Sequence, residues 1–570
     1  MKKKQCLMIA GVVLAFALTA CSKGGEKTSG NEPDPAQKTA AAMDSGKAGI
    51  HQELDGVRMK ETTKITVEVY DRANDGGSKP ENNFYTNYIK EGMLRDHNIE
   101  VEFIPVPRWT ETEQINNLLA GGSAPDICVS YSYPVVSTYS AMGAVVDMAP
   151  ILEDYKDVLP NLWELLGEEN LYYNKDPKTG SLYAIESLRA NQATLCTFVR
   201  ADWLKKLNMK EPTTLEEFET MLYAFKDNAE MLLGADAAKL VPLAYSFDAG
   251  WRAQPLVGSF VPTSMTEKDY YINNFASDRL MTYPNVKEGY RLLNKWYNDG
   301  LIWKDFAIYP TGDPTEDNMI KAGYVGASIG PNWDYPYRNG EDSIQANIQR
   351  ATGDEEAGMV AIDPFQDDTG ARRKYIYSPA GTDRKIFFPA TNNEPVASAL
   401  YLDWISQMDN RLFLQFGEEG VTCETQGDGA VKTLSVTGEK IMNSINNTDY
   451  TLTINGLKMK DEETTLKTVA LGYDTVSSDI ITKAYYASMT DGFFPKHYNL
   501  GDIEAESGIE ESLRVKRDAF LDQAVSASVD KFDAIFDSGF ADYLASGAQA
   551  VIDERTAKWQ EFFGDSTNGK

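Results

Sequence analysis

Histidine and positive charge are both scarce in this sequence. The 570 residues include 3 histidines (His51, His97 and His497) and 55 lysines and arginines against 85 aspartates and glutamates, for a formal net charge of −30. Such acidity argues against nucleic acid or an anionic membrane surface as a partner, because like charges repel. It suits a soluble exported protein.

Cysteine is also rare. Of the 5 cysteines, Cys6 and Cys21 lie at the N-terminus, and Cys128, Cys196 and Cys423 are scattered through apolar stretches. An odd number of widely spaced cysteines provides neither a disulfide framework nor a paired Cys/His metal site. We therefore expect buried free thiols and predict no cofactor.

The N-terminal apolar run is too short to cross a bilayer as a helix. It extends from Leu7 to Ala20 behind three lysines, a length typical of the apolar core of a secretory signal. Its end, Leu18-Thr19-Ala20-Cys21, resembles the bacterial lipobox, in which the cysteine takes a diacylglycerol and the peptide is cut just before it. An ordinary signal peptide with an incidental cysteine is the alternative. We expect a signal peptide at 1–20 and lipidation at Cys21.

Residues 21–61 are rich in Gly, Ser, Lys, Asp and Ala and nearly free of large apolar side chains. This composition predicts a disordered tether. Cleavage before Cys21 leaves 550 residues with a net charge of −33. Because this is too long for one ordinary domain, we expect two lobes.

The folded part begins with alternating strand and helix patterns. In residues 64–70, apolar Ile65, Val67 and Val69 alternate with Thr66 and Glu68, which predicts a strand with the latter two turned outward. Residues 84–95 have helical spacing, and 99–106 form a second strand pattern. Strand, helix, strand implies a right-handed crossover and a parallel sheet, so the fold class is α/β.

Several later helices have clear boundaries. Thr214 and Glu217 stand in capping-box register before an apolar helical face, and Pro395 fits a first helical turn. Helices end at Gly121 and Gly300, and 530–563 is a long amphipathic helical region.

Five motifs, in order, resemble those of bacterial extracellular solute-binding proteins of the carbohydrate importer type (family 1). They are LLAGGSAPDI, GAVVDMAPIL, SLYAIES, VRADWLKKLNMKEPTTLEEFETML and FGEEGVTCE. Two features depart from the family pattern: Ala184 and Glu186 replace the usual Gly and Pro, and 433–471 match poorly.

The resemblance implies a two-lobed periplasmic-binding-protein-like fold with a ligand cleft between the lobes. We expect lobe 1 at 62–184 plus 386–470 and lobe 2 at 185–385 plus 471–570. The chain would cross between them near 180–188, near 380–390 and once more near 470. Parallel sheets present ligands at the carboxyl ends of their strands, and two such edges facing each other make a cleft.

The implied function is capture of a carbohydrate, an oligosaccharide, for the permease subunits of an ABC importer. The protein would be a monomer held by its lipid at the outer face of the cytoplasmic membrane, and not an enzyme. A binder of another solute, such as a peptide, and a surface serine hydrolase are the alternatives.

Sugar sites combine flat aromatic rings with amide, carboxylate and guanidinium groups. The candidate ligand-binding residues lie in loops after predicted strands or just past the first crossing, although ordinary packing is the alternative for each. They are Trp109, Tyr131, Tyr133, Arg189, Asn191, Trp251, Trp333 and Asp334.

The hydrolase alternative depends on Gly326-Ala327-Ser328-Ile329-Gly330, which has the G-x-S-x-G spacing of a nucleophile elbow. An elbow requires a helix directly after the serine, but Pro331, Trp333 and Pro336 follow, which indicates a loop. We therefore predict that Ser328 is a packing residue. Residues 174–183 resemble a degenerate calcium loop without its regular carboxylates, so we expect a plain turn and no metal.

Overall fold

The computed structural model describes residues 54–73, 78–246, 249–275, 278–309, 313–374, 376–378, 380–436, 438–442, 447–489, 492–493, 496 and 498–569. The predicted signal peptide, Cys21, most of the predicted tether, His51 and His497 lie outside these residues. Among the described residues, no helix is both long and apolar enough to cross a membrane.

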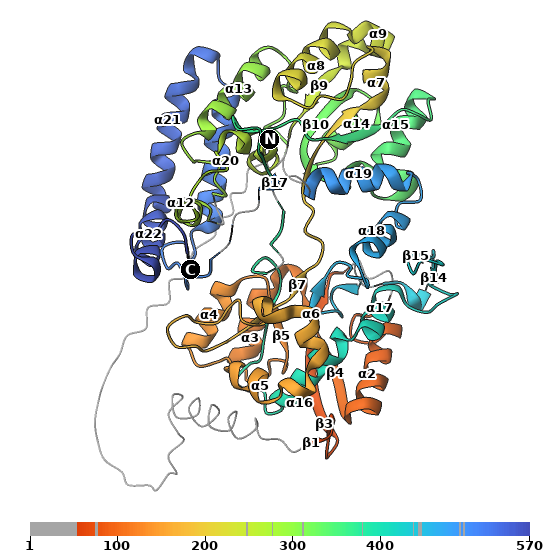
Figure 1. Ribbon diagram of the computed structural model, residues 1–570, viewed down its shortest axis with the longest axis vertical. Helices are drawn as coiled ribbons and strands as arrows, with labels where there is room; N and C mark the ends of the chain where they lie inside the picture. The colour runs from red at the N-terminus through yellow and green to blue at the C-terminus, as the bar shows by residue number, and fades with distance from the viewer. Residues whose placement is uncertain are drawn as a thin grey trace, which may run out of the picture.

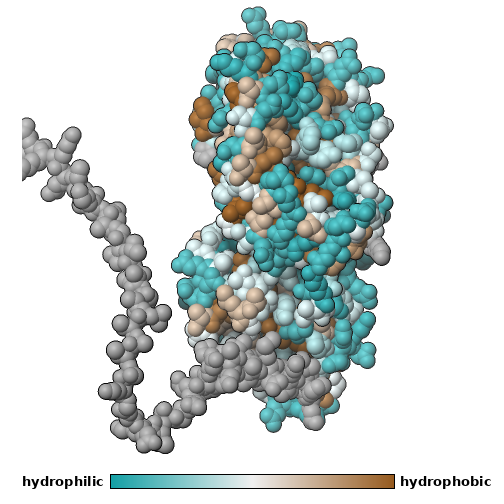
Figure 2. All heavy atoms as spheres, turned by 90° about the vertical axis from the view of Figure 1, so that its left-hand side faces the viewer, coloured by the Kyte–Doolittle hydropathy of each residue, from teal (hydrophilic) through white to brown (hydrophobic). Residues whose placement is uncertain are grey.

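The chain folds into two lobes of helices around small sheets, stacked along the long axis in Figure 1. In the side view of Figure 2 the surface narrows at mid-height, between the lobes. We call the lower body in Figure 1 the first lobe and the upper body the second lobe.

The first lobe is built largely from the N-terminal third of the chain and from a second stretch beginning near residue 385. Its strands are β1 (Leu54–Asp55), β2 (Arg58–Met59), β3 (Thr63–Asp71), β4 (Ile99–Pro107), β5 (Cys128–Ser130), β6 (Ile185–Glu186), β7 (Leu188–Arg189), β13 (Lys385–Phe387), β14 (Cys423–Thr425), β15 (Val431–Thr433) and β16 (Ile454–Asn455). Its helices are α2 (Phe84–His97), α3 (Glu111–Ala120), α4 (Tyr133–Ala141), α5 (Ala149–Asp154), α6 (Pro160–Leu171), α16 (Pro395–Ser406) and α17 (Met408–Phe416).

The second lobe contains the middle and the C-terminal part of the chain. Its strands are β8 (Leu195–Arg200), β9 (Val241–Ala244), β10 (Val325–Asn332), β11 (Met359–Ile362), β12 (Arg372–Arg373) and β17 (Gly492–Phe493). Its helices are α7 (Ala201–Lys206), α8 (Leu215–Asp227), α9 (Ala229–Leu233), α10 (Ala249–Arg252), α11 (Gln254–Val257), α12 (Glu267–Asn273), α13 (Val286–Asn298), α14 (Thr315–Lys321), α15 (Ile344–Thr352), α19 (Ser478–Met489), α20 (Glu510–Ser526), α21 (Phe532–Tyr543) and α22 (Gln549–Phe563). Helix α18 (Glu462–Leu471) contacts both the β15 strand and α19.

The predicted parallel strand pair is confirmed, but the predicted outward position of Glu68 is wrong. β3 and β4 pair in parallel over their whole length, and on its other edge β3 bonds to Ile127. Helices α2 and α16 contact each other and cover the face of Ile65, Val67 and Val69. Glu68 is 0% exposed on the other face, where it accepts from the Val129 amide of β5 at 2.9 Å and lies near Glu111 and Arg108. This second face is exposed at Lys64 and Glu102 and becomes buried only toward the carboxyl ends of the strands, so the alternation alone does not show where the solvent face ends.

The predicted N-terminal cap at Thr214 is present in the structure. The Thr214 hydroxyl accepts a hydrogen bond from the Glu217 amide at 3.2 Å and caps α8. The Glu217 carboxylate accepts from the Thr213 amide at 2.8 Å instead of from Thr214, so the reciprocal half of the box is shifted by one residue.

The end of the predicted tether is part of the folded body in this structure. Residues 54–59 form the β1–β2 hairpin, Met59 is buried, and the Val57 carbonyl lies 2.6 Å from Nδ1 of His97. The apolar side chains of Met59 and Leu54 pack this segment onto the core of the first lobe.

In the part of the chain that the structure describes, three segments connect the lobes. They run from β7 to β8, from β12 to β13, and from α18 to α19. On one side of the molecule, further contacts join the lobes: Asn499 donates to the Tyr173 carbonyl at 2.9 Å, and Lys178 pairs with Glu561 at 2.7 Å.

Candidate functional site

Strand direction turns the loops of both sheets toward the space between the lobes. In the first lobe β13 is antiparallel to both β5 and β6, so β5 and β6 run the same way, and β6 leads through β7 into the second lobe. In the second lobe β10 and β11 are antiparallel to β8, and β9 is parallel to β10. The carboxyl ends of β9, β10 and β11 therefore lie on the side where β8 enters.

Aromatic and arginine side chains gather where β3, β4 and β5 end. The Arg108 guanidinium lies 5.0 Å from the ring centre of Tyr70, 5.6 Å from that of Trp109 and 4.5 Å from that of Tyr131. The Tyr70 and Tyr131 rings are stacked at 6.4 Å, and Arg72 lies 5.8 Å from the Tyr70 ring. We call Tyr70, Arg72, Arg108, Trp109 and Tyr131 the tyrosine–arginine edge.

Buried carboxyl groups hold the side chains of this edge in place. The Tyr70 hydroxyl donates to Glu111 at 2.7 Å, and Arg108 donates to the same oxygen at 3.1 Å. Arg72 donates to both oxygens of Asp449, at 2.7 and 2.9 Å. Each guanidinium is thus oriented by one carboxylate while its side chain stays about a fifth exposed, 20% for Arg72 and 23% for Arg108.

Trp109 is the most exposed part of the edge. It lies in a short 3-10 turn (Arg108–Thr110) directly after β4, and it is 76% exposed. A tryptophan so exposed stabilises the fold little, because little of its apolar surface is removed from water. Its position beside stacked tyrosines and arginines suits contact with a flat ligand face.

Asp383 joins the connecting segments next to the edge. Its carboxylate accepts from Arg189 at 2.9 Å, from Asn455 at 2.7 Å and from Ser187 at 3.0 Å. Burial alone would raise the pKa of Asp383, but the charges of Arg384 and Arg189 outweigh it and lower the pKa. The ionised carboxylate therefore holds three separate stretches of chain together.

Electrostatics connect Asp383 to the tyrosine–arginine edge. The pKa of Tyr131 is raised, mainly by burial. The charge of Asp383 adds to this rise, and the charges of Arg384, Arg108 and Arg72 oppose it. Three of the sequence-predicted residues, Trp109, Tyr131 and Arg189, therefore share one neighbourhood.

The other sequence-predicted residues lie in different surroundings. Tyr133 begins α4 and donates to the Asn174 carbonyl at 3.1 Å, while the backbone of Asn191 packs against Gly456 in the first connecting segment. Trp251 is half-buried on α10, after β9, with the Arg279 guanidinium 4.4 Å from its ring centre.

Trp333 follows β10 but is only 3% exposed. Its ring meets those of Tyr473 and Tyr485 edge-on at 6.0 and 5.4 Å. Asp334 accepts from the Tyr473 hydroxyl at 2.9 Å and pairs with Arg338. In this structure both side chains contact other residues of the protein. Trp333 therefore packs in the core here and does not face a ligand.

The G-x-S-x-G stretch is a strand. Ser328 lies inside β10, a 3-10 turn (Tyr335–Tyr337) follows the strand, and no helix begins directly after the serine. The Ser328 hydroxyl accepts from Arg252 at 2.8 Å, and Arg252 pairs at 2.6 Å with the buried Glu316. Ser328 thus hydrogen-bonds to a buried ion pair. Because the strand continues past Ser328 and no helix begins directly after it, the geometry of a nucleophile elbow is lacking.

The two glycines of this motif have packing roles. A Cβ atom on Gly326 would lie 2.5 Å from the Phe225 ring, and one on Gly330, at φ +69°, would lie 2.0 Å from the Arg252 carbonyl oxygen. Close approach of ring and backbone to β10 therefore explains the glycine spacing.

Residues 174–183 form a turn closed by its own backbone. The Asp176 carboxylate accepts from the amides of Lys178 and Thr179 at 2.7 and 2.9 Å. Across the described part of the chain, no three His, Cys, Asp or Glu side chains are grouped so as to hold a metal ion. Cys128, Cys196 and Cys423 are buried free thiols, as predicted.

Sequence reasoning missed Tyr70, Arg72, Arg108 and Asp383. Arg72 follows β3 as Trp109 follows β4, so the rule that selected Trp109 applies equally to Arg72, whereas Tyr70 lies inside the last two residues of β3. Asp383 has no comparable local signal, because apart from Arg384 its partners come from two distant parts of the chain, Ser187 with Arg189 and Asn455.

The chain resembles known proteins in sequence. Residues 90–410 match the profile of the family described as "Bacterial extracellular solute-binding protein". The chain is 25% identical over 335 residues to "Polygalacturonan/rhamnogalacturonan-binding protein YtcQ" of Bacillus subtilis (strain 168), covering 57% of this chain and 61% of that one. It is 23% identical over 353 residues to "Lipoprotein LipO" of the same organism, covering 60% and 65%. The chain thus matches less than two thirds of the length of either relative.

A solved structure shares the overall fold. It is described as an "HMO binding ABC-transporter associated Solute Binding Protein" from Bifidobacterium longum infantis, with a TM-score of 0.61, 15% identity, and coverage of 88% of this chain and 99% of that one. At this identity the likeness shows the two-lobed α/β fold alone.

Proposed function

The chain belongs to the family of bacterial extracellular solute-binding proteins, and on that premise we propose that it captures an oligosaccharide between its lobes for an ABC importer. A protein of this kind binds its solute without transforming it. Delivery then requires contact with the permease subunits of the importer.

The tyrosine–arginine edge is the observation that supports a sugar ligand. Exposed Trp109 and partly exposed Tyr131, which stacks on the buried Tyr70, offer flat apolar surface, and Arg72 and Arg108 offer N–H donors already oriented by carboxylates. Sugars need both kinds of group, because they combine C–H faces with many hydroxyls. The relative named for binding polygalacturonan and rhamnogalacturonan agrees with a saccharide ligand.

A peptide or another solute is the competing ligand class, since the same scaffold can hold different solutes. A thermal-shift screen distinguishes them, because a ligand that binds only the folded state raises its melting temperature. We expect concentration-dependent stabilisation by oligosaccharides and none by peptides of similar length. If only peptides stabilised the protein, its ligand would be a peptide and not a sugar.

The location of the protein is part of the same proposal. The lipobox-like end at Leu18–Cys21 and the lipoprotein relative support attachment through a lipid on Cys21 at the outer face of the membrane. Cys21→Ser removes the thiol that accepts the lipid, so the variant should leave the detergent phase in a phase-partitioning assay. Unchanged partitioning would overturn the anchor.

A further inference from the structure

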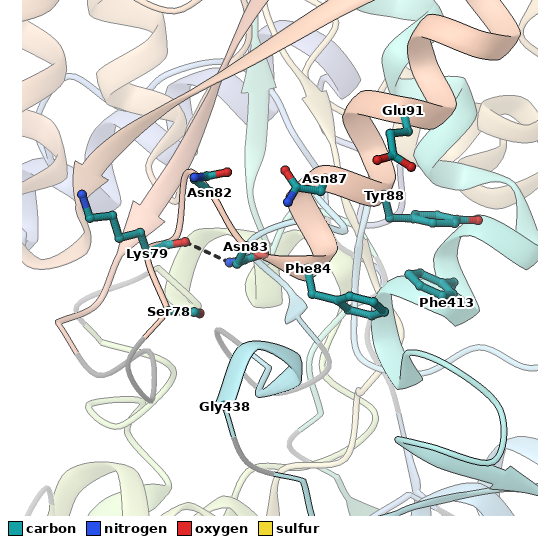
Figure 3. Close-up of a pocket in the computed structure, with 10 residues that line it drawn as sticks. All are labelled: Ser78, Lys79, Asn82, Asn83, Phe84, Asn87, Tyr88, Glu91, Phe413 and Gly438. Atoms are coloured by element: carbon teal, nitrogen blue, oxygen red, sulfur yellow. Dashed lines mark hydrogen bonds between the residues drawn. The ribbon is translucent and has the colours of Figure 1, made fainter.

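A hollow lies at the start of α2, and the loop that leads into it begins at Arg72 of the tyrosine–arginine edge. Its volume is about 640 Å³, and Figure 3 shows its residues converging from the loop before α2, from α2 and from α17. Cavities of roughly 300–1,000 Å³ are of the size that holds small organic ligands. We call it the α2 hollow.

Aromatic rings line one side of the α2 hollow. Tyr88 and Phe413 stack with ring centres 3.8 Å apart, and Phe84 lies 5.5 Å from Phe413. All three are only partly buried, and Figure 3 shows Tyr88 and Phe413 side by side at the wall of the hollow. This wall presents apolar surface that a sugar ring can cover.

Four of the polar side chains that line the rest have no protein partner among the described residues. The side chains of Lys79, Asn82, Asn87 and Glu91 make no hydrogen bond or ion pair with any residue in the described part of the chain. Their neighbour Asn83 differs, because its amide donates to Lys79 and Tyr450 and its oxygen caps α2. Asn83 is structural, whereas no described residue uses the amide donors or acceptors of Asn82 and Asn87.

The mixture of groups specifies the ligand chemistry. Lys79 and Glu91 offset each other in charge, so the hollow selects neither an anion nor a cation. An amide donates and accepts at once, which matches the two neighbouring hydroxyls of a sugar ring. Two free amides beside an aromatic wall suit a neutral, hydroxyl-rich ring.

The α2 hollow adjoins the edge through a short series of contacts. Asn83 donates to the Tyr450 hydroxyl at 2.6 Å, and the next residue, Asp449, holds Arg72 of the edge at 2.7 Å. The loop between β3 and α2 also borders both sites. Tyr450 and Asp449 are buried, so these contacts run beneath the surface, whereas Arg72 and Ser78 are partly exposed; a ligand that spans from Arg72 to Ser78 would contact first the edge and then the hollow.

We infer that the α2 hollow is a second carbohydrate subsite, which takes the distal residues of an oligosaccharide whose other end lies on the tyrosine–arginine edge. This inference rests on the proposed function. It adds a chain-length preference: longer oligosaccharides gain contacts that shorter ones cannot reach.

Calorimetric titration with an oligosaccharide series of increasing length tests this subsite. The variants are Asn87→Ala, which removes a free amide, and Asn87→Trp, which fills the hollow; Asn116→Ala, an exposed asparagine on α3, is the control. We expect the wild type to bind longer members more tightly. Asn87→Ala should weaken only these, by about five- to tenfold, since one hydrogen bond is lost. Asn87→Trp should remove the length preference, and Asn116→Ala should behave as wild type.

Two results would overturn the subsite. One is a wild-type affinity that does not change with length, and the other is a length preference that both Asn87 variants retain. In either case oligosaccharide binding itself stands, so the proposed function survives. Absence of binding to every oligosaccharide would instead reject the proposed function, and the subsite with it.

Discussion

Arg189 and Asp383 form an ion pair across two of the segments that connect the lobes, with Nη1 of Arg189 2.9 Å from Oδ2 of Asp383. The Asp383 side chain is 0% exposed and also contacts Arg384, which is equally buried. A buried carboxylate between two guanidinium groups fixes how the segments enter the first lobe. It thereby also fixes the residues that lie next to the tyrosine–arginine edge.

Asp383→Ala should therefore destabilise the protein strongly. Removing one partner of a buried ion pair leaves an uncompensated charge and typically costs about 3–5 kcal/mol. Urea unfolding measures the loss. The control is Glu356→Ala, because Glu356 pairs with Lys205 where both side chains are 75% exposed, and such pairs contribute about 0–1 kcal/mol. Equal, small losses in both variants would contradict the structural role of Asp383.

Trp333→Ala should lower stability and leave ligand affinity per folded molecule nearly unchanged. Trp333 is 3% exposed against Tyr473 and Tyr485, and truncating a buried tryptophan typically costs about 3–5 kcal/mol. Denaturant unfolding and calorimetric titration of the same preparation separate the two effects. Weak binding with a normal unfolding midpoint would show instead that Trp333 reaches the ligand when the lobes move.

Glu68→Gln should change how stability depends on pH. Burial raises the pKa of Glu68 well above its usual range, although a hydrogen bond from the Val129 amide opposes this. The folded protein therefore keeps this proton to a higher pH than the unfolded chain, whose carboxyl titrates near about pH 4.3. The wild type must lose stability through this group as pH rises above that value, by up to about 1.4 kcal/mol per pH unit until the raised pKa is reached.

The Gln variant carries no such proton. Its stability relative to the wild type should thus be nearly constant below about pH 4 and should increase as the pH rises. Urea unfolding of both proteins between pH 4 and 8 gives the comparison. Parallel stability curves across that range would mean that Glu68 is ionised in the fold.

The sequence was informative where local pattern decides the structure. The β3–α2–β4 unit, the Thr214 cap and the loop position of Trp109 all depend on spacing within a few residues. Glu68 was misplaced because its burial depends on Val129 of β5 and on Arg108 and Glu111, which lie 40 or more residues later in the chain. The burial of Trp333 likewise depends on Tyr473 and Tyr485, more than 130 residues later, and the role of Asp383 depends on Arg189 and Asn455. Such long-range partners leave no trace in a single sequence.

Calorimetric titration of wild type and Trp109→Ala with an oligosaccharide tests the central claim most directly. Trp109 is 76% exposed, so the substitution should leave folding intact, whereas loss of an aromatic anchor typically costs about 2–4 kcal/mol of binding, or roughly thirty- to a thousandfold in affinity. Met231→Ala, an exposed side chain on α9 at the far end of the second lobe, is the control and should bind as wild type. Undiminished affinity in Trp109→Ala would contradict ligand binding at the tyrosine–arginine edge.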